Sequence, residues 1–165
     1  MTKHQYEKIS QPFRTEKGTK WLNIVNKAIT SIGYASYPLM LVYLFFAKFP
    51  ITALYATAVP ASGFILLTFV RKTINRPRPY EALDIDPIIK KDTKGNSMPS
   101  RHVFSMTIIA VTGFIVNGFV GGVLIALSVM LCFVRVIGGV HYPSDVAAGF
   151  FSAVLWGICL YNILP

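Results

Sequence analysis

The chain has 165 residues, of which 53% are hydrophobic and only 14% charged, and its mean hydropathy is +0.53. Soluble domains carry about a quarter of their residues as charged side chains, so this composition excludes an ordinary soluble protein. It indicates a single polytopic membrane domain over residues 1–165.

The net charge of +9 is unevenly placed, because six of the 16 basic residues lie in 1–27 and eight in 71–101. A basic balance can indicate a nucleic-acid partner. Here the basic segment lies between apolar segments, which fits anionic headgroups of a lipid bilayer or a phosphorylated lipid substrate better. We therefore expect no nucleic-acid partner.

In chain order, residues 1–16 form a polar tail that we expect to lack fixed structure. Residues 17–32 follow with apolar side chains at helical spacing and lysines between them. This pattern predicts an amphipathic helix lying in the membrane interface. A frayed amphipathic cap on the helix bundle explains the pattern equally well.

The rest of the chain alternates between apolar segments and short polar ones. Residues 71–101 form the long polar loop, whose place beside the motifs below predicts a catalytic loop. The fold class is therefore all-α, a membrane helix bundle of about five transmembrane helices plus the interfacial helix. The predicted spans are 33–49, 51–70, 103–116, 119–134 and 146–164.

Five spans place three separated stretches at one membrane surface. The loop 71–101 begins and ends on the same face, because the chain leaves one span and enters the next there. The span 119–134 starts on the opposite face and returns, so the turn 135–145 also lies beside the loop. These stretches can therefore share one site.

The first stretch runs from Arg71 to Pro79 and contains four cations, two of which are followed directly by proline. Guanidinium groups match phosphate oxygens in a bidentate geometry. Basic residues at a span end also reach for the headgroups. That alternative explains Arg71 but not the stiff Arg-Pro-Arg-Pro, which favours phosphate binding by Arg78 and leaves Arg76 undecided.

The second stretch is Pro99-Ser100-Arg101-His102, at the start of an apolar span. Ser100 is a good N-cap residue, and the N-terminus of a helix binds anions. A lone histidine is more often structural than functional. His102 lies between an N-cap and an apolar span, however, where it could donate a proton to a leaving oxygen.

The third stretch holds Arg135, His141 and Asp145, the only basic, imidazole or acidic side chains between 103 and 165. Asp145 could orient the His141 imidazole and leave its other nitrogen free to attack phosphorus. An acid at a helix start and a hydrogen-bonded turn histidine are the structural alternatives. Neither explains why these charges alone remain in an apolar segment.

Taken together, Arg-x6-Arg-Pro, Pro-Ser-x-His and Arg-x5-His-x3-Asp resemble the three motifs of the type 2 phosphatidic acid phosphatases, whose site also resembles that of the vanadium haloperoxidases. The resemblance covers about half of the chain, from Arg71 to Asp145. The membrane spans argue against a haloperoxidase. In the phosphatase family, His141 would be the nucleophile, Asp145 its orienting partner and His102 the acid and then the base.

The same resemblance implies that the phosphoryl oxygens bind to basic and hydroxyl side chains and to backbone N–H groups around Arg101. The residues expected to bind phosphate are Arg71, Arg78, Ser100, Arg101 and Arg135. The chain departs from the family pattern at Arg71, where the family usually has Lys, and at Arg101, where it often has Gly. The added cation at Arg101 favours a diphosphate. Family members commonly have six spans, and this chain has five.

The sequence thus predicts a lipid phosphatase that works through a phosphohistidine and needs no metal or other cofactor. No cluster of its three histidines and seven acids has metal-ligand spacing. Undecaprenyl diphosphate, phosphatidylglycerol phosphate and phosphatidic acid are the candidate substrates, with a slight preference for the isoprenoid diphosphate. The alternative is a non-catalytic membrane protein that binds anionic lipids. The oligomeric state stays open.

Two arguments about the orientation of the site in the membrane conflict. Nearly all lysines and arginines lie on the face of the loop, and the positive-inside rule places such a face in the cytoplasm. Resemblance to bacterial family members favours the plasma membrane with the site on its outer face. Phosphate binding accounts for several of these cations, so we expect an extracytoplasmic site.

Overall fold

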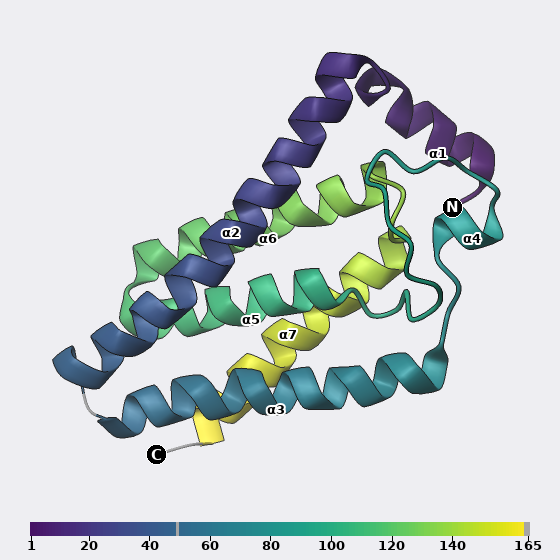
Figure 1. The fold of residues 1–165 in the computed structure, drawn as a ribbon. Helices are drawn as coiled ribbons and strands as arrows, with labels where there is room; N and C mark the ends of the chain where they lie inside the picture. The colour runs from purple at the N-terminus through teal and green to yellow at the C-terminus, as the bar shows by residue number, and fades with distance from the viewer. Residues whose placement is uncertain (49, 164–165) are drawn as a thin grey trace.

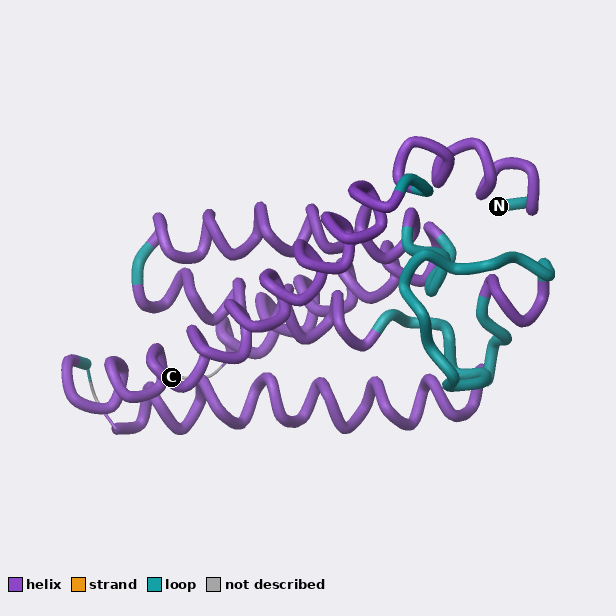
Figure 2. The backbone as a smooth tube through the Cα atoms, turned by 45° about the horizontal axis from the view of Figure 1, so that its top comes forward, coloured by secondary structure: helices purple, strands orange, loops and turns teal. Residues whose placement is uncertain are grey.

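The computed structural model describes residues 1–48 and 50–163 and shows a bundle of five apolar helices with a folded loop and a short N-terminal helix at one end (Figures 1 and 2). This arrangement is the all-α membrane bundle that the sequence predicts. In chain order the elements are α1 (Lys3–Ser10), a 3-10 turn (Gln11–Phe13), α2 (Glu16–Ala47), α3 (Pro50–Ile74), α4 (Pro79–Ala82), α5 (Arg101–Val116), α6 (Gly118–Ile137) and α7 (Pro143–Ile163).

Four helices in the described part of the chain, α2, α3, α6 and α7, are long and apolar enough to cross a membrane. The fifth, α5, is apolar but has only 16 residues. At 1.5 Å per residue it covers about 24 Å, which is less than the ~30 Å hydrocarbon core. All four longer helices pack against α5, so this short helix forms the centre of the bundle.

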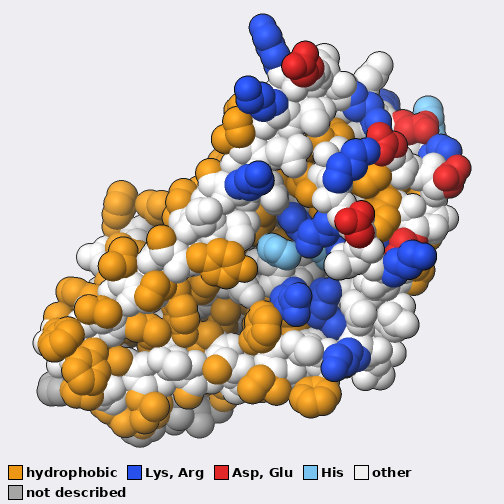
Figure 3. All heavy atoms as spheres, viewed as in Figure 1, with side chains coloured by type: hydrophobic (Ala, Val, Ile, Leu, Met, Phe, Trp, Pro, Cys, Tyr) orange, Lys and Arg blue, Asp and Glu red, His pale blue; other side chains and the backbone are white. Residues whose placement is uncertain are grey.

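The surface has the distribution of a membrane protein, with large apolar side chains on the outside. Phe46, Phe69 and Phe119 are 80%, 64% and 79% exposed. In Figure 3 hydrophobic side chains cover the bundle, while Lys and Arg gather at the end that carries the loop and α1. The end that carries the loop and α1 is therefore the basic end of the bundle, where anionic headgroups would be attracted.

Close approach of small residues joins the helices inside the bundle. A Cβ atom on Gly113 of α5 would lie 3.2 Å from the Cα of Gly121 in α6. The Thr107 and Ser128 hydroxyls, also on α5 and α6, share a 2.6 Å hydrogen bond. In a bilayer, van der Waals packing and interhelical hydrogen bonds replace the hydrophobic effect as the source of helix association. These contacts fix α5, and with it the stretch 99–102 from which the helix starts.

The expectation of an unstructured tail over residues 1–16 is wrong. Thr2 caps α1, and the fully buried Tyr6 donates a 3.3 Å hydrogen bond to the carbonyl of Asp86. Arg14 donates to the same carbonyl at 2.9 Å. Because these partners lie in the distant loop, the polar composition of the segment gave no sign that it would fold.

The predicted interfacial helix 17–32 and the first span form one continuous helix, α2, of 32 residues. At the predicted boundary stands Gly33, and a single glycine costs about 1 kcal/mol, too little to end a helix. The helix also continues through Pro38, five residues further on. At about 48 Å, α2 is longer than the hydrocarbon core, so its lysine-bearing N-terminal turns extend beyond it. The predicted span ends at Phe49 and Leu164 lie outside the described residues.

Candidate active site

The three sequence stretches meet at one end of the bundle, as their order along the chain predicts. The backbone N–H of Ser100 donates to the carbonyl of Asp145 at 2.8 Å, which joins the start of α5 to the start of α7. The N–H of Ile89 donates to the carbonyl of Gly138 at 3.1 Å, which joins the loop to the end of α6. The prediction of convergence is confirmed.

His141 and Asp145 form a buried pair at the start of α7. Their side chains are 2% and 0% exposed, and Nδ1 of the imidazole lies 3.5 Å from Oδ2 of the carboxylate. The same oxygen accepts hydrogen bonds from the Ser97 hydroxyl at 2.5 Å and the Tyr142 N–H at 2.9 Å. Because Nδ1 faces the carboxylate, Nε2 on the opposite edge of the ring is left for chemistry.

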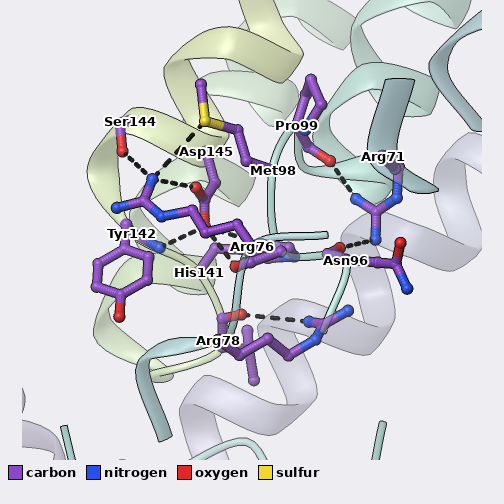
Figure 4. A network of polar contacts seen from close by, with 12 residues as sticks. Arg71, Arg76, Arg78, Asn96, Met98, Pro99, His141, Tyr142, Ser144 and Asp145 are labelled. Carbon is purple, nitrogen blue, oxygen red and sulfur yellow. Dashed lines mark hydrogen bonds and ion pairs between the residues drawn. The ribbon is translucent and has the colours of Figure 1, made fainter. Parts of the chain in front are cut away.

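Arg76 is a site residue that the sequence left undecided. Its Nη1 lies 2.8 Å from the second oxygen of Asp145 and 2.8 Å from the Ser144 hydroxyl (Figure 4). The guanidinium also stacks over the Tyr142 ring at 4.1 Å from its centroid. Both carboxylate oxygens of Asp145 are therefore held by donors, so the carboxylate has one orientation toward His141. The Arg-Pro-Arg-Pro stiffness was the one sequence signal for this role.

Replacing Arg76 by Gln should lower kcat for phosphate release about tenfold with little change in KM, because a charged hydrogen bond to a half-exposed arginine is lost. Arg76→Lys keeps the charge and should recover part of the rate. Steady-state kinetics on the two variants measures the effect. An unchanged kcat in Arg76→Gln would mean that Ser97 and the Tyr142 backbone hold Asp145 without help.

Burial lowers the pKa of His141 to about 3, and the positive charges of Arg135 and Arg78 act in the same direction. The hydrogen bond to Asp145 opposes this shift without cancelling it. Since an ordinary histidine has a pKa near 6.5, His141 is neutral at physiological pH. A neutral imidazole has the free electron pair that a nucleophile requires.

As the pH falls from about 8 to about 5, the His141 ring should therefore stay neutral in the ligand-free protein, because this whole range lies above its lowered pKa. Nitrogen NMR of histidine-labelled protein in detergent measures the protonation state directly. The chain has three histidines, and the signal missing from His141→Gln assigns the ring. Protonation of the His141 ring near pH 6.5, the ordinary histidine pKa, would contradict the burial of this pair.

Two of the expected phosphate-binding residues carry buried donors without a partner. Arg135 is 1% exposed, and its Nη1 donates to Asn26 of α2 at 3.3 Å. Among the described residues, none accepts from its Nε and Nη2, and the buried Ser100 hydroxyl also lacks a partner. Buried donors are almost always paired in proteins, so these groups mark a place for an anion. Asn26 could not be found from the motifs.

Arg71 and Arg78 hold the loop backbone as well as supplying charge. Arg71 donates from both terminal nitrogens to the carbonyls of Asn96 and Pro99. Arg78, which is 5% exposed, donates to the carbonyls of Gly95 at 3.2 Å and Val140 at 3.3 Å. The arginine in place of the family's usual lysine at position 71 therefore tightens the stretch that leads into α5.

Lys91, in the loop, is a further cation that sequence reasoning missed. Burial lowers its pKa to about 8, followed by the positive charges of the site arginines, Arg135, Arg78, Arg101 and Arg71. The positive charges of these arginines therefore disfavour the charged form of Lys91. Such a gathering of cations is stabilised when an anion binds. Lys91 lies in an irregular loop, and the sequence there has no pattern from which its role could be predicted.

His102 lies in the first turn of α5, next to the backbone hydrogen bond from Ser100 to the carbonyl of Asp145. Together with Arg101, it lines a cavity of about 320 Å³ that extends from the site between α2, α3 and α5. The two histidines thus lie on elements that the fold brings together. Within the described chain, no group of three His, Cys, Asp or Glu side chains is placed to hold a metal ion.

Comparison with known proteins agrees with this geometry. The fold is similar to the crystal structure of LpxE from Aquifex aeolicus, with a TM-score of 0.74 and 19% identity over 96% of this chain and 93% of that one. It is also similar to a structure described as the first transmembrane PAP2 type phosphatidylglycerolphosphate phosphatase, from Bacillus subtilis, with a TM-score of 0.76 and 22% identity over 97% of this chain and 84% of that one.

No curated protein sequence matches the chain. The family model described as the PAP2 superfamily matches residues 50–165, which contain all three motif stretches and the buried pair His141–Asp145. This match covers well over half of the chain and includes the helices α3, α5, α6 and α7 that build the site. The protein belongs to the PAP2 superfamily.

Proposed function

We propose that this membrane phosphatase removes the terminal phosphate of a lipid phosphate or diphosphate through a phosphohistidine at His141. The observation that carries the proposal is the pairing of the buried His141 imidazole with Asp145. Among the described residues no group accepts from Nε and Nη2 of Arg135 or pairs with the Ser100 hydroxyl, and a phosphoryl group is an anion that these donors would match. Fixed cations of this kind stabilise the charge of a phosphoryl-transfer transition state.

In the first step, Nε2 of His141 attacks phosphorus, and the bond from phosphorus to the leaving oxygen breaks. His102 donates a proton to that oxygen, so the lipid product leaves with this oxygen protonated. In the second step, His102 takes a proton from water as the water oxygen attacks phosphorus. The P–N bond breaks, inorganic phosphate is released and His141 returns to its neutral form.

An isoprenoid diphosphate, such as undecaprenyl diphosphate, is the substrate that we favour over phosphatidylglycerol phosphate and phosphatidic acid. The positive charges of Arg71, Arg78, Arg101 and Arg135 all lower the pKa of Lys91, so this end of the bundle carries several cations. A diphosphate carries more negative charge than a monophosphate and matches such a site better. The similar Bacillus subtilis structure is described as a phosphatidylglycerolphosphate phosphatase, which supports a phosphorylated lipid as the substrate class.

We place the active site on the outer face of a bacterial plasma membrane. Arg71, Arg78 and Arg135 make specific contacts within the site, so their charge says little about which side the loop occupies. Replacing the exposed Asp84 by Cys, in a chain without Cys132 and Cys159, provides the test. A membrane-impermeant maleimide should label this cysteine in intact cells, and labelling only after lysis would place the site in the cytoplasm.

Phosphate release by purified protein in detergent with EDTA tests the proposed reaction. The panel contains undecaprenyl diphosphate, phosphatidylglycerol phosphate and phosphatidic acid. We expect release that survives EDTA and is fastest with the diphosphate. If folded protein releases no phosphate from any of the three, the basic end of the bundle only binds anionic lipid and the proposal fails.

A further inference from the structure

Two cavities share part of their lining and lead away from His102 into the side of the bundle. The first, of about 320 Å³, has its polar end at Thr30, Arg101 and His102. The second, of about 430 Å³, is lined mainly by apolar side chains of α2, α3 and α5. Tyr34, Phe64, Ser105 and Ile109 line both. One passage therefore changes from polar to apolar as it moves away from the catalytic histidines.

This passage lies at the depth of the membrane-crossing helices, so its apolar part faces lipid rather than water. Figure 3 shows a hollow between α2 and α3 with a histidine and Lys or Arg side chains at its inner end and hydrophobic side chains around the rest. An apolar chain that enters from the bilayer would lie in the second cavity. Its polar head would then lie in the first cavity, next to His102.

The position of His102 determines which part of the substrate occupies the first cavity. Because His102 protonates the leaving oxygen in the proposed reaction, the leaving group lies on its side of the phosphorus atom. In a lipid diphosphate, the group bonded to that oxygen is a second phosphate. In phosphatidic acid it is carbon, and in phosphatidylglycerol phosphate three carbons separate the two phosphates. The first cavity therefore meets a charged group only in a diphosphate.

Arg101 is the side chain available to bind that group. It is exposed and lies over the Phe64 ring, 5.6 Å from the centroid. The other arginines of the site donate to protein oxygens, as described above for Arg71, Arg76, Arg78 and Arg135. Among the arginines that the structure describes, Arg101 alone makes no hydrogen bond or ion pair. A free guanidinium at the polar end of this cavity can form a bidentate contact with phosphate.

We propose that Arg101 and the polar end of the first cavity bind the lipid-linked phosphate of a diphosphate substrate, while the terminal phosphate lies at His141. Arg101 is then the residue that selects a diphosphate over a monophosphate. The inference rests on the proposed phosphatase reaction and adds a second phosphate site to it. The products are inorganic phosphate and a lipid monophosphate whose former bridging oxygen has received the proton from His102.

Farnesyl diphosphate and farnesyl monophosphate form the matched pair for the test, because they share one chain and differ only by the second phosphate. Arg101→Gln should lower kcat/KM for the diphosphate about 10- to 100-fold, the loss expected for one charged hydrogen-bonded contact. For the monophosphate the loss in kcat/KM should be at least about tenfold smaller than for the diphosphate. Lys90→Gln removes the same charge from an exposed lysine of the same loop and should leave the ratio of the two substrates unchanged.

Arg101→Lys retains the charge and length of the side chain, which protects folding, but it loses the bidentate geometry. It should show the same selective loss at a smaller size, so the test does not depend on the stability of the Gln variant. An equal loss for both substrates, or no loss, overturns the second phosphate site while the phosphatase reaction stands. The same holds if the wild type hydrolyses only the monophosphate. If the wild type hydrolyses neither, the proposed function itself fails.

Discussion

His141→Ala should release phosphate from lipid phosphates at least about 10³-fold more slowly than the wild type, because the variant has no nucleophile to form the covalent intermediate. The fixed cations remain in place and account for whatever rate is left. Single-turnover phosphate release in detergent with EDTA measures the loss. Substrate binding should survive, since the arginines that we propose bind the phosphate are unchanged.

His4→Ala is the matched control, because it makes the same substitution at an exposed position on α1. Its rate should equal that of the wild type. Quenching the wild-type reaction with base should in addition trap labelled phosphate on the protein, since phosphohistidine is stable to base and labile to acid. A His141→Ala rate within about tenfold of the wild type would move the nucleophile to another residue.

Arg135→Met should lower phosphate release by about 10²- to 10³-fold, the loss seen when one donor to a developing charge is removed. Without ligand, however, the variant should unfold at a temperature at least as high as the wild type. Arg135 is a buried cation with two unpartnered donors, and an uncompensated buried charge destabilises the protein that carries it. Methionine fills a similar space without that charge.

Thermal unfolding with and without inorganic phosphate separates the two effects. Wild-type protein should be stabilised by phosphate, because a ligand that binds only the folded state raises the unfolding temperature. Arg135→Met should lose most of this shift. A variant that unfolds earlier and keeps the full phosphate shift would show that the unpartnered donors of Arg135 do not face the phosphate.

The sequence was sufficient to predict that the candidate site residues converge on one face, because its evidence was local. Charge is rare in the apolar half of the chain, so Arg135, His141 and Asp145 stood out, and the order of the spans brought them to the face of the loop. Ser100 directly precedes the first residue of α5, as its N-cap chemistry predicts, although its hydroxyl caps nothing. Each of these inferences depends on nearest neighbours or on helix order, which a sequence displays directly.

What escaped prediction depends on contacts between distant segments. Arg76 lies 69 residues from Asp145 along the chain, and its pattern alone did not separate a surface residue from a carboxylate partner. Tyr6 folds the N-terminal segment through an oxygen 80 residues away. Lys91 lies in a loop without periodicity. In each case the three-dimensional course of the loop decides the contact, and that course leaves no repeating pattern in the sequence.

The helix α2 lies before the segment that the family model matches, yet it supplies Asn26 to Arg135 and Thr30, Gly33 and Tyr34 to the wall of the passage. The proposed reacting groups and much of the wall of the proposed lipid passage therefore belong to different parts of the chain. We expect mutations in α2 to alter which lipid fits without changing a motif residue. Exchanging this one helix between members of the superfamily is therefore a direct way to change the lipid specificity of the enzyme. Natural divergence could have changed it in the same way.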